Sequence, residues 1–160
     1  MTGVTCFLGI DPGPVTGLAV AYWDEDSWMH PGAYQCDTDS APALLGWLAG
    51  QHTRIPVRAA VEEFRPGTGA GARGVNAGVT RSAVDALVKV AQANGAVTVV
   101  RPAAAVKPWA TDTRLKKAGL LAVCHGMPHA ADAFRHLLYT AVRDAGVPDP
   151  LSRRGVPSAG

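Results

Sequence analysis

Short apolar runs separated by turn residues fill the first third of the chain. Val4–Ile10 is such a run and ends in a D-P-G turn, and two further runs follow at 16–23 and 27–34. Runs of this length between Gly, Pro and Asp residues are typical of β-strands. Pro31 cannot donate a main-chain hydrogen bond, which places the third run near a sheet edge. The pattern therefore predicts three antiparallel strands.

Helical patterns alternate with two more strand-like runs in the rest of the chain. Apolar residues recur there every three or four positions, behind residues that commonly cap helices. The expected helices begin at Asp39 or Ser40, at Ser82 with Asp85 completing a capping box, at Thr111 or Asp112 and at Pro128; the expected strands are 57–64 and 96–100, and a helical turn is expected at 102–106. This order predicts an α/β fold in which the first and fourth strands are neighbours.

Length and composition predict one domain. A chain of 160 residues can bury its own core, and we expect a folded domain at 1–145 with a disordered Pro, Gly, Ser and Arg tail at 146–160. With 48% hydrophobic residues, no apolar run long enough to span a membrane and no basic leader, we expect a cytoplasmic protein with no membrane partner. Cys6, Cys36 and Cys124 are too few and too scattered for a disulfide framework or a zinc site, and we expect free thiols.

Charge is distributed unevenly along the chain. Residues 1–63 contain two basic and eight acidic residues, a net charge of −6, whereas residues 64–160 contain thirteen basic and five acidic residues, a net charge of +8. This asymmetry suits a protein that gathers carboxylates in one place and offers Lys and Arg to a polyanion in another.

Four polar residues could meet at one edge of the predicted sheet. Asp11 and Glu62 both follow apolar strand runs, and the carboxyl ends of neighbouring strands are where such sheets bind ligands. Two carboxylates placed there repel each other unless a cation lies between them. On the last helix, His129 and Asp132 share a face, and these donors suit Mg²⁺ and, with the imidazole, also Mn²⁺. Alternatively, Asp132 pairs with Arg135 or His136 on a solvated helix face.

Four segments resemble, in order, the RuvC-type Holliday-junction resolvases of the RNase H-like (retroviral integrase) superfamily. They are Gly9-Ile10-Asp11-Pro12-Gly13 with Thr16-Gly17, Val61-Glu62-Glu63-Phe64, Val106-Lys107, and His129-Ala130-Ala131-Asp132-Ala133. The likeness runs from about Leu8 to Val142. It implies an RNase H-like fold with a five-stranded mixed sheet in the order 3-2-1-4-5.

The resemblance also implies a chemistry and the residues that perform it. Asp11, Glu62, His129 and Asp132 occupy the catalytic, metal-binding positions, and Lys107 matches a basic residue beside the scissile phosphate. Many family members have Asp where this chain has His129. The implied activity is that of a crossover-junction endodeoxyribonuclease: a homodimer that hydrolyses four-way or branched DNA junctions by symmetric nicks, with two Mg²⁺ or Mn²⁺ ions per site and no nucleotide cofactor. Glu63 competes with Glu62, but strand alternation lets only one of them face the site.

Further residues are candidates for DNA or partner contacts. A Gly-rich loop flanked by Arg65, Arg73 and Arg81, a helix with Arg114, Lys116 and Lys117, and Lys107 itself are expected to bind phosphates. The loop could equally be a plain insertion and the helix a solvated face. Phe64 either stacks on a splayed base or, as we favour, belongs to the core. The stripe of Val84, Leu87, Val88 and Ala91 either forms the dimer interface or packs on the sheet.

Some of these segments also resemble motifs of other protein classes. The Gly-rich loop contains G-x-G-x-x-G at Gly69, Gly71 and Gly74, but the loop is too long for the tight turn of a dinucleotide site. The G-I-D-P-G segment also resembles the phosphate loop of the actin and sugar-kinase ATPases, whose two lobes exceed this length. A different RNase H-fold nuclease, acting on RNA–DNA hybrid or flapped DNA, and a catalytically silent DNA-binding module remain open. The source is expected to be bacterial or phage.

Overall fold

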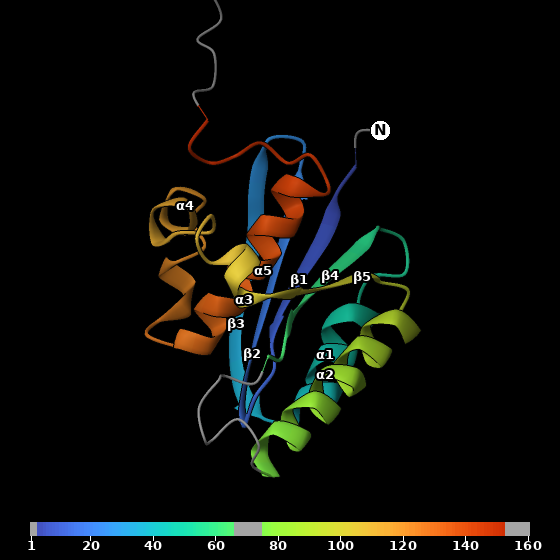
Figure 1. Cartoon of the computed structure of the whole chain (residues 1–160). Helices are drawn as coiled ribbons and strands as arrows, with labels where there is room; N and C mark the ends of the chain where they lie inside the picture. Colours follow the sequence, from blue (N-terminus) through green and yellow to red (C-terminus); the bar gives the residue numbers. More distant parts are fainter. Residues whose placement is uncertain (1–2, 66–74, 153–160) are drawn as a thin grey trace, which may run out of the picture.

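The fold was analysed in a computed structural model that describes residues 3–65 and 75–152. Figure 1 shows its elements in chain order. The strands are β1 (Thr5–Asp11), β2 (Val15–Asp24), β3 (Ser27–Asp37), β4 (Val57–Glu63) and β5 (Val97–Pro102). The helices are α1 (Ala41–Gly50), α2 (Val75–Ala93), α3 (Ala103–Val106), α4 (Asp112–Lys117), the 3₁₀ helix η2 (Ala122–Cys124) and α5 (Pro128–Arg143).

The five strands form one mixed sheet in the order β3-β2-β1-β4-β5. β1, β2 and β3 pair antiparallel, while β4 lies parallel to β1 and β5 parallel to β4. The register aligns Ile10 of β1 with Val61 of β4. The predicted fold and strand order are confirmed, and the first and fourth strands are neighbours as expected.

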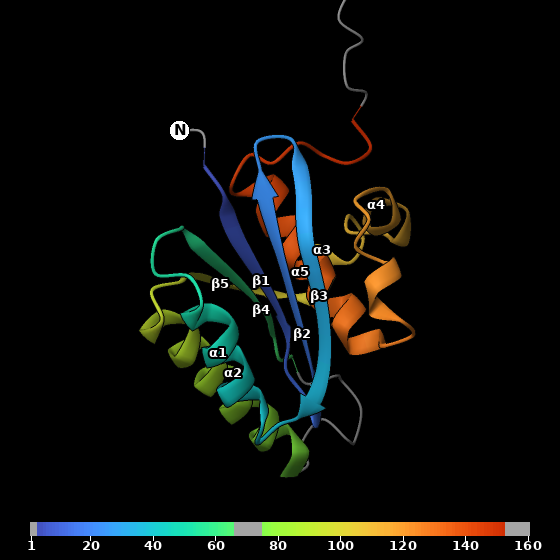
Figure 2. The ribbon, with the colours of Figure 1, turned by 180° about the vertical axis from the view of Figure 1, so that it is seen from behind.

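Helices cover both faces of the sheet. α1 and α2 lie on one face and α5 on the other, as the two opposite views show (Figures 1 and 2). Side chains alternate along β1: Leu8 and Ile10 pack in the core under α1 and α2, whereas Phe7 packs in the core under α5. Asp11, two residues after Gly9, therefore faces the α5 side.

Two glycines let α5 lie unusually close to the sheet. A Cβ atom on Gly9 would overlap the carbonyl oxygen of Ala133, and one on Gly17 would overlap that of His129. Because these carbonyls belong to the helix backbone, no side-chain rotation could relieve the overlap. The glycines of the G-I-D-P-G and T-G segments therefore bring the N-terminal half of α5 down onto β1 and β2.

The start of α2 differs from the prediction. The helix begins at Val75, so Ser82 is an exposed residue within it and does not cap it. Val75, Gly78, Val79 and Thr80 are weak helix formers, which hid the first two turns from the sequence pattern. The Gly-rich segment that we expected to form a loop therefore ends before Val75, and residues 66–74, which include Arg73 and the G-x-G-x-x-G segment, lie outside the described part.

The apolar stripe of α2 belongs to the core. Val84, Leu87 and Ala91 are buried and Val88 packs against the same cluster, together with strand residues and α1. Three of its four side chains are therefore covered within the chain, as the alternative of packing on the sheet predicts, and Val88 stays partly exposed.

The described chain continues past the predicted boundary at residue 145. Val147 is buried beside α5, and Asp149 forms an ion pair with Arg114, with Nε 3.1 Å from Oδ1. Val147 and Asp149 of the expected tail therefore contact the domain, whereas residues 153–160 lie outside the described residues. The three cysteines are free thiols, as predicted. None of the helices in the described ranges has the length and hydropathy of a membrane span.

Candidate active site

Two carboxylates stand side by side at the carboxyl ends of β1 and β4. Because Ile10 is aligned with Val61, the next residues, Asp11 and Glu62, occupy adjacent positions on the α5 side of the sheet. Glu63 has the opposite orientation and pairs with Arg65, with Nε 2.9 Å from Oε2. The choice of Glu62 over Glu63 as the residue that faces the site agrees with this geometry.

The first turn of α5 is hydrogen-bonded to β3, the edge strand of the sheet. Pro128 occupies the first turn, and the capping residue Met127 offers no side-chain acceptor to the free main-chain N–H groups. Gln35 of β3 supplies one instead, because its Oε1 accepts a hydrogen bond from the His129 N–H at 2.9 Å. This contact fixes the position of His129 over β2, from where its side chain reaches Asp11.

His129 makes a direct contact with Asp11. Its Nδ1 lies 2.9 Å from Oδ2 of Asp11, which is buried. Burial raises the pKa of Asp11 to about 6; the hydrogen bond with His129 opposes this rise, and the charges of Glu62 and Asp132 add to it. The carboxylates thus create an excess of negative charge that favours a cation nearby.

Lys107, at the end of α3, supplies one such cation. Its Nζ lies 2.8 Å from Oδ2 of Asp132 and 3.7 Å from Oε2 of Glu62. Burial opposes the charged form of Lys107, but the hydrogen bond to Asp132 and the charges of both carboxylates outweigh it, so the pKa of the ammonium group is raised. Lys107 therefore bridges the carboxylate from β4 and the carboxylate from α5.

Arg135 holds the other oxygen of Asp132. Its Nε lies 3.2 Å from Oδ1 of Asp132, and its guanidinium also donates to the carbonyl of Ala110 at 2.6 Å and to Asp112. Asp132 therefore pairs with Arg135, as the alternative hypothesis predicted. It faces the other carboxylates at the same time. The anchored guanidinium fixes the direction of the Asp132 side chain.

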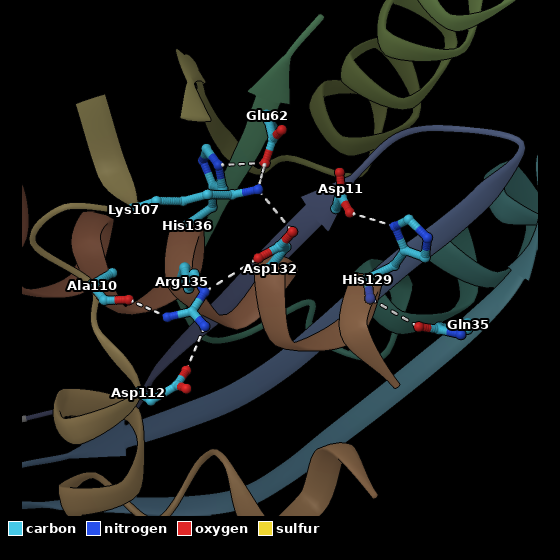
Figure 3. Close-up of polar contacts among 10 residues, drawn as sticks. All are labelled: Asp11, Gln35, Glu62, Lys107, Ala110, Asp112, His129, Asp132, Arg135 and His136. Carbon is cyan, nitrogen blue, oxygen red and sulfur yellow. Dashed lines mark hydrogen bonds and ion pairs between the residues drawn. The ribbon is translucent and has the colours of Figure 1, made fainter. Parts of the chain in front are cut away.

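His136 is the site residue that the sequence left unassigned. Its side chain is 1% exposed, and its Nε2 lies 3.0 Å from Oε2 of Glu62. Figure 3 shows His136 and Lys107 converging on the same end of Glu62. His136 follows Asp132 by one helical turn, and this spacing could have placed it on the same face. Its apolar neighbours in the sequence gave no further signal.

The carboxylate and imidazole groups of the site are suitable ligands for a divalent cation, but they are not arranged around one common point. No group of three or more His, Cys, Asp or Glu side chains within residues 3–65 and 75–152 is arranged to hold a metal ion. In this arrangement Glu62 and Asp132 contact Lys107, and Asp11 contacts His129. The ammonium group shows that this position accepts a cation, and carboxylate oxygens are the ligands that Mg²⁺ and Mn²⁺ prefer.

The predicted DNA-binding residues are scattered. Arg114 is held by Asp149 and stacks over Trp109, with its guanidinium carbon 4.5 Å from the ring centroid, so its charge serves the fold. Lys116 and Lys117 are exposed on α4. Arg65 and Arg81 are exposed, and Arg73 lies outside the described residues. Phe64 packs against the core under α1 and α2, as favoured from the sequence.

A hollow lies directly beside Glu62. It measures about 430 Å³ and is lined by Pro12, Glu62, Glu63, Phe64, Arg65, Pro102, Ala103 and Ala104. A larger hollow of about 700 Å³ lies between the β2–β3 turn and residues 148–152, and of the predicted site residues it contains Lys117. Of the three site carboxylates, the smaller hollow is lined by Glu62.

Comparisons with known proteins support the fold. No family model matches the chain, and no curated protein matches it in sequence. A solved structure of Thermus thermophilus RuvC in complex with a Holliday junction substrate matches with a TM-score of 0.56 and 19% identity, over 92% of this chain and 99% of that chain. Another structure of Thermus thermophilus RuvC matches with a TM-score of 0.59 and 21% identity, over 93% and 100% of the two chains. The chain therefore has the RNase H-like fold of RuvC, as the resemblance of its motifs predicted.

Proposed function

We propose that this protein is a structure-selective endonuclease that resolves four-way or branched DNA junctions by metal-dependent hydrolysis of phosphodiester bonds. One observation carries the proposal: on a RuvC fold, the carboxylates of Asp11, Glu62 and Asp132 gather at one end of the sheet with His129 and Lys107. Because the structural match includes a RuvC bound to a Holliday junction, branched DNA is the first substrate to test.

Asp11, Glu62 and Asp132 would hold the divalent ions, with His129 as a further ligand or as the group that orients water. When bound, Mg²⁺ or Mn²⁺ supplies a Lewis acid for the negative charge that develops on the phosphate oxygens. Two ions per site are part of this proposal. It requires Glu62 and Asp132 to release Lys107, whose side chain is 39% exposed and has room to move.

His129 is suited to accept a proton from water. A carboxylate at Asp11 accepts a hydrogen bond from Nδ1, which leaves Nε2 of the neutral imidazole as the acceptor. The side chain is 44% exposed, so this nitrogen can be reached from solvent. Once released by the carboxylates, the Lys107 ammonium would pair with the scissile phosphate and stabilise its charge in the transition state.

We also propose that the protein acts as a homodimer and that exposed basic residues bind the DNA backbone. A four-way junction has two-fold symmetry, so paired nicks require two identical sites, which a homodimer provides. The buried side chains of the α2 stripe are not available for that interface. The exposed residues Arg65, Arg81, Lys116 and Lys117 would contact phosphates away from the cleavage point.

A cleavage panel tests the proposal directly. Labelled four-way junction, flap, linear duplex and RNA–DNA hybrid of matched length are incubated with the protein in Mg²⁺ or Mn²⁺, and nick positions are mapped on each strand. We expect preferential binding of the junction and nicks at symmetric positions on two opposing strands. Cleavage of hybrid or flap without binding or paired nicking of the junction would instead indicate a different RNase H-fold nuclease. A catalytically silent module would show neither cleavage nor thermal stabilisation by divalent ions.

A further inference from the structure

His136 is an imidazole in an unusual place. It lies on α5 one turn after Asp132, is 1% exposed, and sits on a helix face where Ala133, Leu137 and Thr140 are also buried. Burying a polar ring is costly unless it forms a hydrogen bond. The partner that the structure provides is the Glu62 carboxylate, 3.0 Å from Nε2.

The chemistry of this pair fixes the direction of the hydrogen bond. An ionised carboxylate only accepts hydrogen bonds, so Nε2 of His136 carries a proton and donates it to Oε2 of Glu62. The contact between Lys107 and Glu62 ends on the same oxygen. Figure 3 shows the second oxygen of Glu62 turned away from both partners. The imidazole therefore sets the rotation of the carboxylate and leaves its other oxygen available.

The two partners of Glu62 differ in how firmly they are held. Lys107 reaches Glu62 at 3.7 Å with a side chain that is 39% exposed, whereas His136 is enclosed by the core. A cation or phosphate that displaces Lys107 leaves the contact between His136 and Glu62 in place. His136 is thus the fixed partner in both arrangements.

We propose that His136 is a positioning residue that orients the Glu62 carboxylate for divalent-metal binding from beneath the site. This inference depends on the part of the proposed function in which Glu62 binds a divalent metal ion. It does not depend on the identity of the DNA substrate. Hydrogen-bond partners behind metal ligands hold those ligands in their binding orientation, and their loss weakens metal affinity by roughly 10- to 100-fold.

Mn²⁺ binding to the purified full chain, followed by the EPR signal of free Mn²⁺, tests the inference without DNA. We expect His136→Leu to weaken Mn²⁺ binding by roughly tenfold or more, and His136→Gln, whose amide can still donate to Glu62, to recover most of that loss. Thr140→Val is the matched control: Thr140 is buried on the same helix, and its hydroxyl accepts a hydrogen bond from Arg101 at 3.0 Å, away from Glu62. It should bind Mn²⁺ as the wild type does even if its melting temperature falls.

NMR of the wild-type imidazole covers the case in which His136→Leu fails to fold. The ¹⁵N shifts should show the proton of neutral His136 on Nε2 and should change when Mg²⁺ is added or when Glu62 is replaced by Gln. Wild-type Mn²⁺ affinity in His136→Leu, or His136 shifts that are insensitive to both Mg²⁺ and Glu62→Gln, would overturn the inference. So would a wild-type protein that binds no Mn²⁺. If Mn²⁺ binding weakens as expected but no junction is cut, the inference stands and the junction-resolving function fails.

Discussion

The Nζ atom of Lys107 lies 2.8 Å from Oδ2 of Asp132, and this contact places an ammonium group beside a carboxylate that we propose as a metal ligand. Lys107 also lies 3.7 Å from Glu62, so under the proposed function it would compete with a metal ion for both carboxylates. We predict that Lys107→Met raises the affinity for Mn²⁺ by roughly tenfold, equivalent to about 1.4 kcal/mol, and at the same time slows cleavage. The two effects have opposite signs because the lysine blocks the ion but assists the phosphate.

Lys89→Met provides the matched control for this prediction. Lys89 is exposed on α2 and makes none of the carboxylate contacts that Lys107 makes. Calorimetric titration with Mn²⁺ and single-turnover cleavage of a junction should both be close to wild type in affinity and rate constant for this variant. If Lys107→Met binds Mn²⁺ more weakly than the wild type, the ammonium does not compete with the ion.

Asp11→Asn tests the centre of the site. Asp11 lies between His129 and the other two carboxylates, and an amide binds Mg²⁺ far less well than a carboxylate. We expect junction cleavage to fall by at least roughly 10²-fold, while junction affinity measured by gel shift without divalent ions stays the same or rises. Asp85→Asn, an exposed change on α2, is the control and should leave both quantities unaltered. Full cleavage by Asp11→Asn would remove the metal-site hypothesis.

The pKa of Asp11 predicts how stability depends on pH in the absence of metal. Because the pKa is raised from its ordinary value of 3.8 to about 6, the folded protein binds this proton more tightly than the unfolded chain does. The contribution of Asp11 to stability is therefore complete below about pH 4 and is lost as pH rises through about 6, by an amount on the order of 3 kcal/mol. In Asp11→Asn this contribution is absent.

Urea unfolding in EDTA across this pH range isolates the effect. The quantity to compare is the difference in unfolding free energy between the wild type and Asp11→Asn, since other titrating groups cancel in it. The unfolding free energy of the wild type should fall relative to that of Asp11→Asn as pH rises from about 4 to 6. A difference that is independent of pH would mean that the Asp11 carboxyl group titrates as an exposed one does.

Gly17→Ala tests the close approach of α5. The added methyl group would overlap the His129 carbonyl, so the helix must move away from β2. We expect a loss of about 1–3 kcal/mol in unfolding free energy and a loss of cleavage, because His129 moves with the helix. Gly3→Ala is the control, since a Cβ atom there meets no atom within 4 Å. Equal stability of the two variants in thermal melts would show that α5 does not depend on this contact.

The order of the strands along the chain and the positions of Asp11 and Glu62 at strand ends were predictable from local sequence patterns. Alternation along β4 lets only one of Glu62 and Glu63 face α5, and the resemblance of the Val61-Glu62-Glu63-Phe64 segment to the family motif selected Glu62. The D-P-G turn after β1 and Pro128 at the start of α5 marked two boundaries in the same way. Such signals act between neighbouring residues and can be read without knowing the tertiary structure.

The rest of the site depends on contacts between distant segments. Arg135 reaches Ala110 and Asp112, and His136 reaches Glu62, 74 residues away. An Arg and a His on a helix are compatible with many partners, so the sequence could not choose among them. The packing of Val147 against α5 could not be predicted for the same reason. A Pro- and Gly-rich segment has the same sequence pattern whether it packs on a core or extends into solvent.

The position of α5 in the chain has a consequence for how the protein is made. Asp11 and His129 are separated by 118 residues, and the helix that carries His129, Asp132, Arg135 and His136 is the last one described. During synthesis the carboxylate of Asp11 leaves the ribosome before any of these four residues, so the site stays incomplete until α5 has emerged. The core between β1 and α5, which includes Phe7, Phe134 and Leu137, also closes only at that point.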